Sequence, residues 1–479
     1  MTSVLPDGWE MVIGLEVHCE LATASKLFCS CPNSFGDQPN ANTCPTCLGL
    51  PGSLPVLNAG AVEMAMRLGR ALACDVNRSV FSRKNYFYPD QPKDYQVTQY
   101  DLPTNEHGHL ELPSGLRVGI TRAHIEEDTG KLTHVGGGGR VHDAVHSLVD
   151  YNRSGVPLVE IVSEADMRSS DQAREYVAEL RAILLATGVS DAKMEEGSMR
   201  VDANVSVHHE GEPWGTRCEI KNLNSLRSLG RAIDHEALRQ IDLIEAGERV
   251  HQQTRHWDEA SGRTGLLRSK EDADDYRYFP EPDLVPLEPT AADIARIDAA
   301  LPRLPAARRS QLATAAGIDH TDGAVAIAVE RGLDDLAAAA IAAGADAGRV
   351  LTHVEHNLAV EGAEELRAEH LAALVQMESA GELTATQAKT VLAEVVATGA
   401  SPAQVAADKG FEALGSDALE GFVDEVIAAH PGEWEQLRSG DDKAQGKLMG
   451  FFMGKVMQAS KGQADGKAAT ALLRSKAGR

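Results

Sequence analysis

The sequence predicts an α+β protein, in which a sheet-rich N-terminal part is followed by two helical parts. Several segments before residue 290 alternate apolar and polar residues, as strands with one buried face do. Prolines gather in PEPDLVPLEPT, at 280–290, and indicate a domain boundary. Beyond it alanine becomes abundant and cysteine is absent, so we expect residues 291–479 to be mostly helical.

The chain of 479 residues is long enough for two to four domains of roughly 100–200 residues each. We expect three, over residues 1–290, 291–410 and 411–479. The second boundary depends on several helix-stopping and helix-starting residues in SPAQVAADKGFEALGSD, at 401–417. In the last part apolar residues recur at helical spacing, and lysines interleave with them.

The first predicted strand, VIGLEVHCEL at 12–21, has two chemically different faces. Its odd positions are all apolar, whereas its even positions include Glu16, His18 and Glu20. Such alternation is typical of an antiparallel sheet with one buried face. A single polar strand face can simply be exposed to water. These residues indicate a functional site only if neighbouring strands carry similar polar residues on the same face.

Other predicted strands repeat the pattern with similar residues. SMRVDANVSVHH gathers Arg200, Asp202 and Asn204 on one face, GITRAHIEEDTGK contributes Glu126, and RCEIKNLNS contributes Lys221. Converging carboxylates repel one another unless a cation neutralises them, and Mg²⁺ binds carboxylate oxygens together with water and phosphate. Nearby Lys and Arg side chains would contact the phosphates directly. The sheet is therefore a candidate floor for Mg²⁺ and a nucleotide.

Two common nucleotide-binding patterns are missing from the sequence. G-x-x-x-x-G-K-[ST] does not occur, and no G-x-G-x-x-G follows a predicted strand and opens a helix. If the protein uses ATP, we expect metal on acidic side chains to hold it.

Four cysteines form two close pairs in FCSCPNSFGDQPNANTCPTCLG. The spacing is C-x-C, twelve residues and C-x-x-C, which suits tetrahedral Zn²⁺ in a structural site. The predicted ligands are Cys29, Cys31, Cys44 and Cys47. The alternative is four unrelated thiols. The other three cysteines fall in apolar patterns and are expected in the core.

Composition and charge restrict where and how the chain works. It has no apolar run of about 18 residues, no secretory signal pattern and an odd number of cysteines, so we expect a cytoplasmic protein that avoids membranes. The net charge of −25 argues against nucleic-acid binding over the whole surface. Residues 443–479 nevertheless hold eight Lys or Arg and one Asp, a net charge of +7. They would form either a local phosphate-binding surface or an ordinary solvated tail.

Eight segments occur in an order that resembles one protein family. They are VIGLEVHCEL, SRKNYFYPDQPKDYQVTQYD, GITRAHIEEDTGK, DYNRSGVPLVEIVSE, KMEEGSMRVDANVSV, EIKNLNS, DDYRYFPEPDLVPL and GKLMGFFMGKVMQASKGQA. Together they resemble the B subunits of the aspartyl/glutamyl-tRNA amidotransferases, from about residue 10 to residue 475.

The resemblance implies a reaction, partners and a fold. Glu or Asp mischarged onto tRNA(Gln) or tRNA(Asn) would be phosphorylated on its side-chain carboxylate with ATP and Mg²⁺. Ammonia released from glutamine by the family's A subunits would then displace the phosphate, and a small C subunit would hold the A and B subunits together. The N-terminal domain would resemble the glutamine synthetase/guanido kinase fold, an antiparallel sheet with helices behind it. The helical domain and the helical tail would both contact tRNA.

The resemblance also implies roles for individual residues. Glu16, His18 and Glu127 match family positions at the metal site. Strand alternation favours Glu126 over Glu127, so we keep both Glu126 and Glu127 as candidates. Glu195 and Glu196 belong to a motif expected around the Mg²⁺. The expected catalytic residues are Glu16, His18, Glu126, Glu127 and Lys221. The expected nucleotide or aminoacyl-end contacts are Arg83, Lys84, Asn85, Tyr86, Arg200, Asp202, Asn204 and Arg277. Structural salt bridges or loop contacts are the alternative for the less specific assignments.

Two departures from the family pattern and two rival functions remain. The segment 135–147 is longer than the family pattern leads us to expect. The four cysteines are not universal in the family, so zinc would stabilise the fold and take no part in catalysis. A zinc-containing tRNA-binding module would consume no ATP. A stand-alone ATP-dependent ligase would hydrolyse glutamine by itself, but no glutaminase signature is evident. The sequence does not distinguish Glu-tRNA(Gln) from Asp-tRNA(Asn) as substrate.

Overall fold

The computed structural model describes residues 4–136, 144–269, 276–411, 416–439, 442–460, 464 and 466–478. The chain divides into two compact units, Met1–Ala306 and Ala307–Arg479. The first combines sheets and helices and the second is helical, so the α+β class is as predicted.

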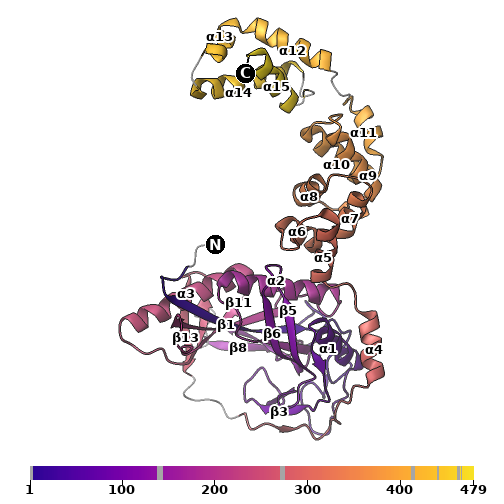
Figure 1. Ribbon diagram of the computed structural model, residues 1–479. Helices are drawn as coiled ribbons and strands as arrows, with labels where there is room; N and C mark the ends of the chain where they lie inside the picture. Colours follow the sequence, from indigo (N-terminus) through magenta and orange to yellow (C-terminus); the bar gives the residue numbers. More distant parts are fainter. Residues whose placement is uncertain are drawn as a thin grey trace. The chain divides into compact units, whose positions relative to one another are not determined.

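The N-terminal unit is built on one large sheet (Figure 1). In order from edge to edge its strands are β13 (Arg263–Ser269), β12 (Gln253–Asp258), β11 (Cys218–Leu223), β10 (Met199–His209), β1 (Trp9–Glu20), β9 (Pro157–Ser163), β6 (Arg117–Glu127), β5 (Asn105–Glu111) and β2 (Asp75–Val76). The predicted first strand lies inside the sheet, between β10 and β9.

The sheet is mixed, which corrects the prediction of a wholly antiparallel one. β11 and β12 pair in parallel, whereas the pairings of β1, β10, β9, β6 and β5 are antiparallel. Parallel neighbours need a crossover connection, and the 20-residue helix α3 (Leu226–Glu245) provides it. The alternation of apolar and polar residues in the sequence indicates half-buried strands, but it does not indicate whether neighbouring strands pair in parallel or antiparallel.

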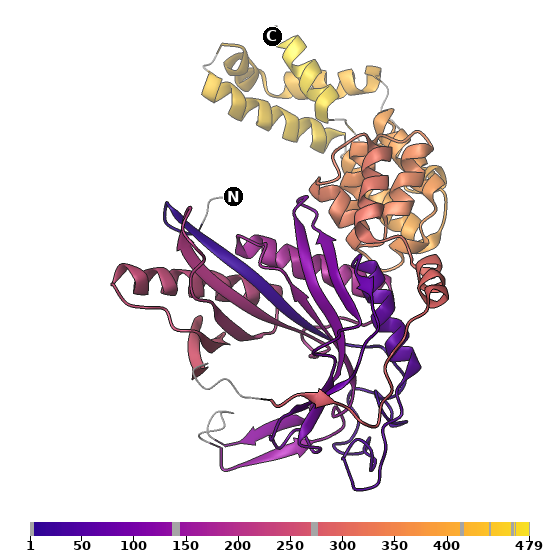
Figure 2. The same ribbon diagram turned by 60° about the horizontal axis from the view of Figure 1, so that its bottom comes forward.

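Helices cover one face of this sheet. Figure 2 shows α3 and α2 (Ser170–Ala186) along one side, with the strands of the smaller sheets on the other side. The odd residues of β1, including Ile13, Leu15 and Val17, are buried in one core with residues of these helices and of α1 (Ala59–Ala71). Burial of this apolar face leaves the even residues of the same strands on the helix-free face.

A small sheet borders the helix-free face. It consists of β14 (Phe279–Pro280), β3 (Ser82–Asn85) and β4 (Tyr95–Thr98). A separate hairpin pairs β7 (Lys131–Val135) with β8 (His146–Asp150). Most of the long segment 135–147 noted in the sequence, residues 137–143, lies outside the described residues.

The N-terminal unit continues past the proline cluster. Helix α4 (Ala291–Ala300) packs on α1, where Arg70 Nε donates to Asp298 Oδ1 at 2.7 Å. The compact N-terminal unit ends at Ala306. The proline-rich segment itself runs along the unit, because Ser79 and Leu287 exchange backbone hydrogen bonds.

The helices of the C-terminal unit bury two separate apolar clusters. The first is formed by residues between Leu312 and Ala406 and the second by residues between Leu419 and Leu473. The helices are α5 (Pro305–Ala316), α6 (Gly323–Glu330), α7 (Asp334–Ala342), α8 (Ala347–His356), α9 (Ala368–Ser379), α10 (Ala385–Thr398), α11 (Pro402–Asp408), α12 (Ser416–Ala429), α13 (Pro431–Ser439), α14 (Asp442–Ala459) and α15 (Gly466–Lys476). Among the described residues, none of the helices is long and apolar enough to cross a membrane.

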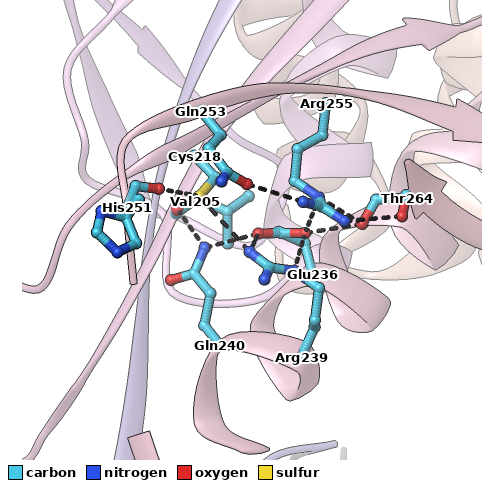
Figure 3. A network of polar contacts seen from close by, with 9 residues as sticks. All are labelled: Val205, Cys218, Glu236, Arg239, Gln240, His251, Gln253, Arg255 and Thr264. Atoms are coloured by element: carbon cyan, nitrogen blue, oxygen red, sulfur yellow. Dashed lines mark hydrogen bonds and ion pairs between the residues drawn. The ribbon is translucent and has the colours of Figure 1, made fainter. Parts of the chain in front are cut away.

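A buried ionic network fastens α3 to the β12–β13 edge (Figure 3). Glu236 is fully buried, and its carboxylate accepts hydrogen bonds from Arg239 at 2.5 Å and Thr264 at 2.9 Å. Arg255 Nε of β12 lies 3.3 Å from the same carboxylate. Gln240 Nε2 donates both to Glu236 and to the Val205 carbonyl of β10. The Glu236 carboxylate therefore connects the crossover helix directly with β12 and β13, and Gln240 extends the network to β10.

Candidate active site

Three side chains from adjacent strands meet at the centre of the helix-free face. They are His18 on β1, Glu160 on β9 and Glu126 on β6. His18 Nε2 lies 3.6 Å from Glu126 Oε1 and 3.9 Å from Glu160 Oε2. The cross-strand register explains the meeting, because His18 pairs with Glu160, which pairs with His124 of β6. One ligand atom from each of the three lies within 4.8 Å of the other two, a donor set that suits a divalent cation.

The pKa values of the two carboxyl groups, Glu126 and Glu160, are shifted in opposite directions. Burial, and then the charge of Glu160, raise the pKa of Glu126, whose side chain is 5% exposed. Burial would also raise the pKa of Glu160, but the adjacent His124 and His18 outweigh it and lower that pKa. His124 Nε2 is 3.3 Å from Glu160 Oε2. A cation here would offset the repulsion between two buried carboxylates.

A second polar group continues from this centre toward β11. Asn204 Nδ2 donates to Glu16 Oε1 at 2.9 Å, and Lys221 Nζ reaches Asp202 Oδ2 at 2.6 Å and Glu219 Oε1 at 3.0 Å. Burial, and then the charges of Glu160 and Glu219, raise the pKa of Glu16. Glu16 is therefore next to the three-residue centre but outside its closest set of ligand atoms.

Arg200 lies at the N-terminal end of β10, on the helix-free face. Its Nη2 donates to Asp128 Oδ2 at 2.7 Å, and Arg153 Nε lies 3.5 Å from the same oxygen. Burial alone would raise the pKa of Asp128, but Arg200 and Arg153 outweigh it and lower that pKa. Arg200 thus has a carboxylate partner within the fold.

The small sheet brings a cation and aromatic rings to the same centre. The positive charge of Lys84 on β3 offsets part of the rise in the pKa of Glu126. Lys84 Nζ lies 4.7 Å from the centroid of the Tyr276 ring. The Tyr278 ring stacks on Tyr100 with centroids 4.3 Å apart. Burial raises the pKa of Tyr278, and Glu126 and Glu160 add smaller contributions.

Glu127, Glu195 and Glu196 lie outside the three-residue centre. Glu127 points away from Glu126 along the strand, pairs with Lys93 and accepts the Val97 amide hydrogen at 2.9 Å. Glu195 and Glu196 are exposed in the segment before β10, where Glu196 Oε1 accepts from Lys193 at 3.0 Å.

The remaining expected nucleotide contacts support the small sheet. Arg83 forms a bidentate pair with Glu281 at 2.6 and 2.7 Å. Asn85 Nδ2 donates to the carbonyls of Tyr276 and Arg277. Tyr86 stacks with Tyr88, and the Arg277 guanidinium lies 5.8 Å from the centroid of the Phe87 ring. Of the sequence RKNY, Lys84 is the residue whose charge acts on Glu126.

Sequence reasoning did not select Glu160 of the three-residue centre, nor His124 beside it. Glu160 is the only charged residue within the apolar strand PLVEIVS, and an isolated charge in such a run is a usable signal. His124 shares the parity of Glu126 in GITRAHIEEDTGK, but its closeness to Glu160 depends on β6 pairing with β9.

The four predicted zinc ligands also come together. One sulfur from each of Cys29, Cys31, Cys44 and Cys47 lies within 4.8 Å of the others. The Cys44 amide donates to Cys47 Sγ at 3.1 Å. The hydrogen bond from Cys29 lowers the pKa of Cys47 to about 5, and the same bond raises the pKa of Cys29. Four converging sulfurs with a stabilised thiolate fit a tetrahedral metal ion.

Comparisons with known proteins identify the family of this chain. Residues 11–295 match the GatB/GatE catalytic domain family, and residues 346–476 match the GatB domain family. The chain belongs to the GatB family. Among the described residues, strands β2 to β14 and the three residues of the carboxylate centre lie inside the first match, and β1 begins two residues before it.

The similarity to curated proteins covers nearly the full chain. It is 47% identical to the aspartyl/glutamyl-tRNA(Asn/Gln) amidotransferase B subunit of Frankia casuarinae, over 97% of this chain and 95% of the relative. The B subunit of Anaeromyxobacter sp. strain K is 48% identical, over 98% and 99%. That of Picosynechococcus sp. is 44% identical, over 98% and 97%. These relatives are thus named as one subunit, B, of an amidotransferase.

Proposed function

We propose that this GatB chain carries out the ATP-dependent step of a tRNA-dependent amidotransferase. It phosphorylates the side-chain carboxylate of Glu-tRNA(Gln), Asp-tRNA(Asn) or both, and then transfers ammonia to it. The observation that carries this proposal is the cluster of His18, Glu126 and Glu160, with Lys84 close by on the small sheet. Family membership and the names of the relatives support the choice of substrate.

The chemistry explains why ATP is needed. A carboxylate is a poor acyl donor, because its oxygen does not leave. One carboxylate oxygen attacks the γ-phosphorus of ATP, ADP leaves, and an acyl phosphate forms. The ammonia nitrogen then attacks the acyl carbon, phosphate leaves with the C–O bonding pair, and one proton is lost to give the amide. Most of the catalytic effect in phosphoryl transfer comes from positioning and charge neutralisation.

The residues present fit this task. His18, Glu126 and Glu160 would hold Mg²⁺, with Glu16 beside them, and the ion would neutralise the phosphate oxygens. Lys84 offers a positive charge within electrostatic range of Glu126, and this charge would attract a transferring phosphoryl group. Lys221 is held between Asp202 and Glu219 and would keep this acidic wall in a fixed arrangement. Asn204 would orient Glu16 through its amide.

Other parts of the chain receive supporting roles. The cysteine cluster would hold structural Zn²⁺ apart from the reaction. Residues 411–479 would contact the tRNA, which the local net charge of +7 over residues 443–479 supports. Ammonia would come from a glutaminase, the A subunit of the assembly, which is held to this chain with a small C subunit. We also propose the glutamine synthetase/guanido kinase fold for residues 1–290, supported by the broad sheet with carboxylates on its helix-free face. The assembly would work in the cytoplasm.

The test is ADP formation by the assembled A, B and C subunits with and without Glu-tRNA(Gln). We expect Glu160→Gln to reduce tRNA-dependent ADP formation by at least a hundredfold, while glutamine hydrolysis continues. Glu111→Gln, at an exposed position of β5, is the matched control and should behave as wild type. Wild-type rates in Glu160→Gln would refute the proposed site. A pure tRNA-binding module would give no ADP formation with any variant.

A further inference from the structure

A hollow lies on the helix-free face beside Glu16. Its volume is ≈340 Å³, and it is lined by β1, β9 and β10 and by the segment before β11. Small residues form its floor, with Gly14 of β1 paired to Asn204 of β10 and Ser206 two residues further on. Glu16 and Asn204 belong both to this hollow and to the polar group next to the carboxylate centre. The hollow therefore adjoins the proposed reaction site.

An exposed tryptophan forms one wall of the hollow. Trp214 is 60% exposed, although large aromatic side chains are usually buried. Gly215 holds it in place, because a Cβ there would lie 2.2 Å from the Val207 carbonyl oxygen, so only glycine allows this approach to β10. The Arg168 guanidinium lies 5.6 Å from the centroid of the Trp214 ring. The ring is thus fixed at its backbone and supported by a cation, as a stacking platform would be.

The spacing along β1 connects the hollow with the carboxylate centre. Gly14, Glu16 and His18 point to the same face, and four residues of strand span about 13 Å. This is a distance that the ribose and phosphates of a nucleoside triphosphate bridge. Acidic Glu16 and Glu164 line the hollow and offer acceptors for ribose hydroxyl groups.

We propose that this hollow binds the base and ribose of the ATP, with the base stacked on Trp214. The inference rests on the proposed function, because it assumes that the phosphates reach the centre of His18, Glu126 and Glu160. Stacking tolerates any base, so the shape of the floor at Gly14 and Ser206 would favour one base over another. The terminal adenosine of the tRNA offers the same chemistry, and the experiment separates the two sources.

The experiment measures equilibrium binding of Mg-ATP and of Mg-tripolyphosphate, which has no base, to the assembled enzyme. For Trp214→Ala we expect the Kd for ATP to rise about tenfold to a hundredfold, the effect of one base–aromatic contact, with tripolyphosphate binding unchanged. Trp214→Phe should retain most of the affinity. Phe35→Ala removes an aromatic residue that is 79% exposed elsewhere and should bind ATP as wild type does.

A second variant tests the space independently of the tryptophan. Gly14→Ala adds a methyl group at a strand position where the nearest atoms to a Cβ are 3.8 Å away, so it should fold and narrow the hollow. It should weaken ATP binding and leave tripolyphosphate binding intact. Unchanged ATP affinity in both variants would overturn the inference. A raised KM for Glu-tRNA(Gln) with unchanged ATP affinity would assign the hollow to the tRNA end instead. Failure of wild type to bind tripolyphosphate would instead refute the proposed function.

Discussion

Removing the carboxylate of Glu236 tests how the crossover helix holds the edge of the sheet. Glu236→Gln keeps the side-chain size but leaves Arg239 and Arg255 without their counter-ion. Their side chains are 22% and 12% exposed, so water compensates only in part. Breaking a buried ion pair on one side typically destabilises a protein by about 3–5 kcal/mol. For a unit of this size, we expect the midpoint of thermal unfolding to fall by about 5–8 °C.

The pH dependence gives this prediction a second readout. Burial would raise the pKa of Glu236, but Arg239 outweighs it and lowers that pKa. A carboxyl with a lowered folded pKa contributes its full stability above the unfolded value near 4.5 and loses it as the pH falls. The stability difference between wild type and Glu236→Gln should therefore shrink below pH 4.5.

The assay is calorimetry of the full chain at several pH values. Glu245→Gln, at the exposed end of the same helix, is the matched control and should change the stability by less than about 0.5 kcal/mol. A Glu236→Gln midpoint within 2 °C of wild type, or a difference independent of pH, would refute the account of this network.

Three further outcomes follow from other parts of the structure. Cys47→Ser should lower the zinc content, measured by atomic absorption, together with the unfolding midpoint; unchanged content would remove the zinc assignment. Lys221→Met should slow ADP formation about tenfold or more, since a charge-assisted contact to Asp202 contributes roughly 1.5–3 kcal/mol; a wild-type rate would make Lys221 dispensable. Gly69→Ala should destabilise the chain by about 1–3 kcal/mol in denaturant titrations, because its Cβ would lie 1.9 Å from Asn105 Oδ1, and equal stability would contradict this packing.

Local sequence patterns predicted the parts of the site that depend on one strand. Alternation in VIGLEVHCEL placed Glu16 and His18 on one face, and the structure pairs them with Asp202 and Arg200 across β10. The cysteine spacing predicted a cluster, and four sulfurs converge. Each pattern is set by the geometry of the local backbone, so it can be read without knowing the fold.

Strand order and side-chain partners could not be read in this way. Glu160 joins the centre because β9 lies between β1 and β6, which depends on long-range pairing. In the neighbouring pair Glu126 and Glu127, the carboxylates point to different partners, one of them Lys93. Arg83 lies next to Lys84 in sequence but is bound to Glu281, because successive residues of a strand face opposite sides.

The transfer of the substrate's own oxygen tests the central claim most directly. Glu-tRNA(Gln) labelled with oxygen-18 in the side-chain carboxylate would be given to the assembled enzyme with ATP and glutamine, and the released phosphate analysed by mass spectrometry. Phosphorylation on the face of His18, Glu126 and Glu160 predicts about one labelled oxygen per phosphate with wild type, and no labelled phosphate with Glu160→Gln. Phosphate free of label, formed along with amidated tRNA, would contradict an acyl phosphate and with it the proposed role of this face.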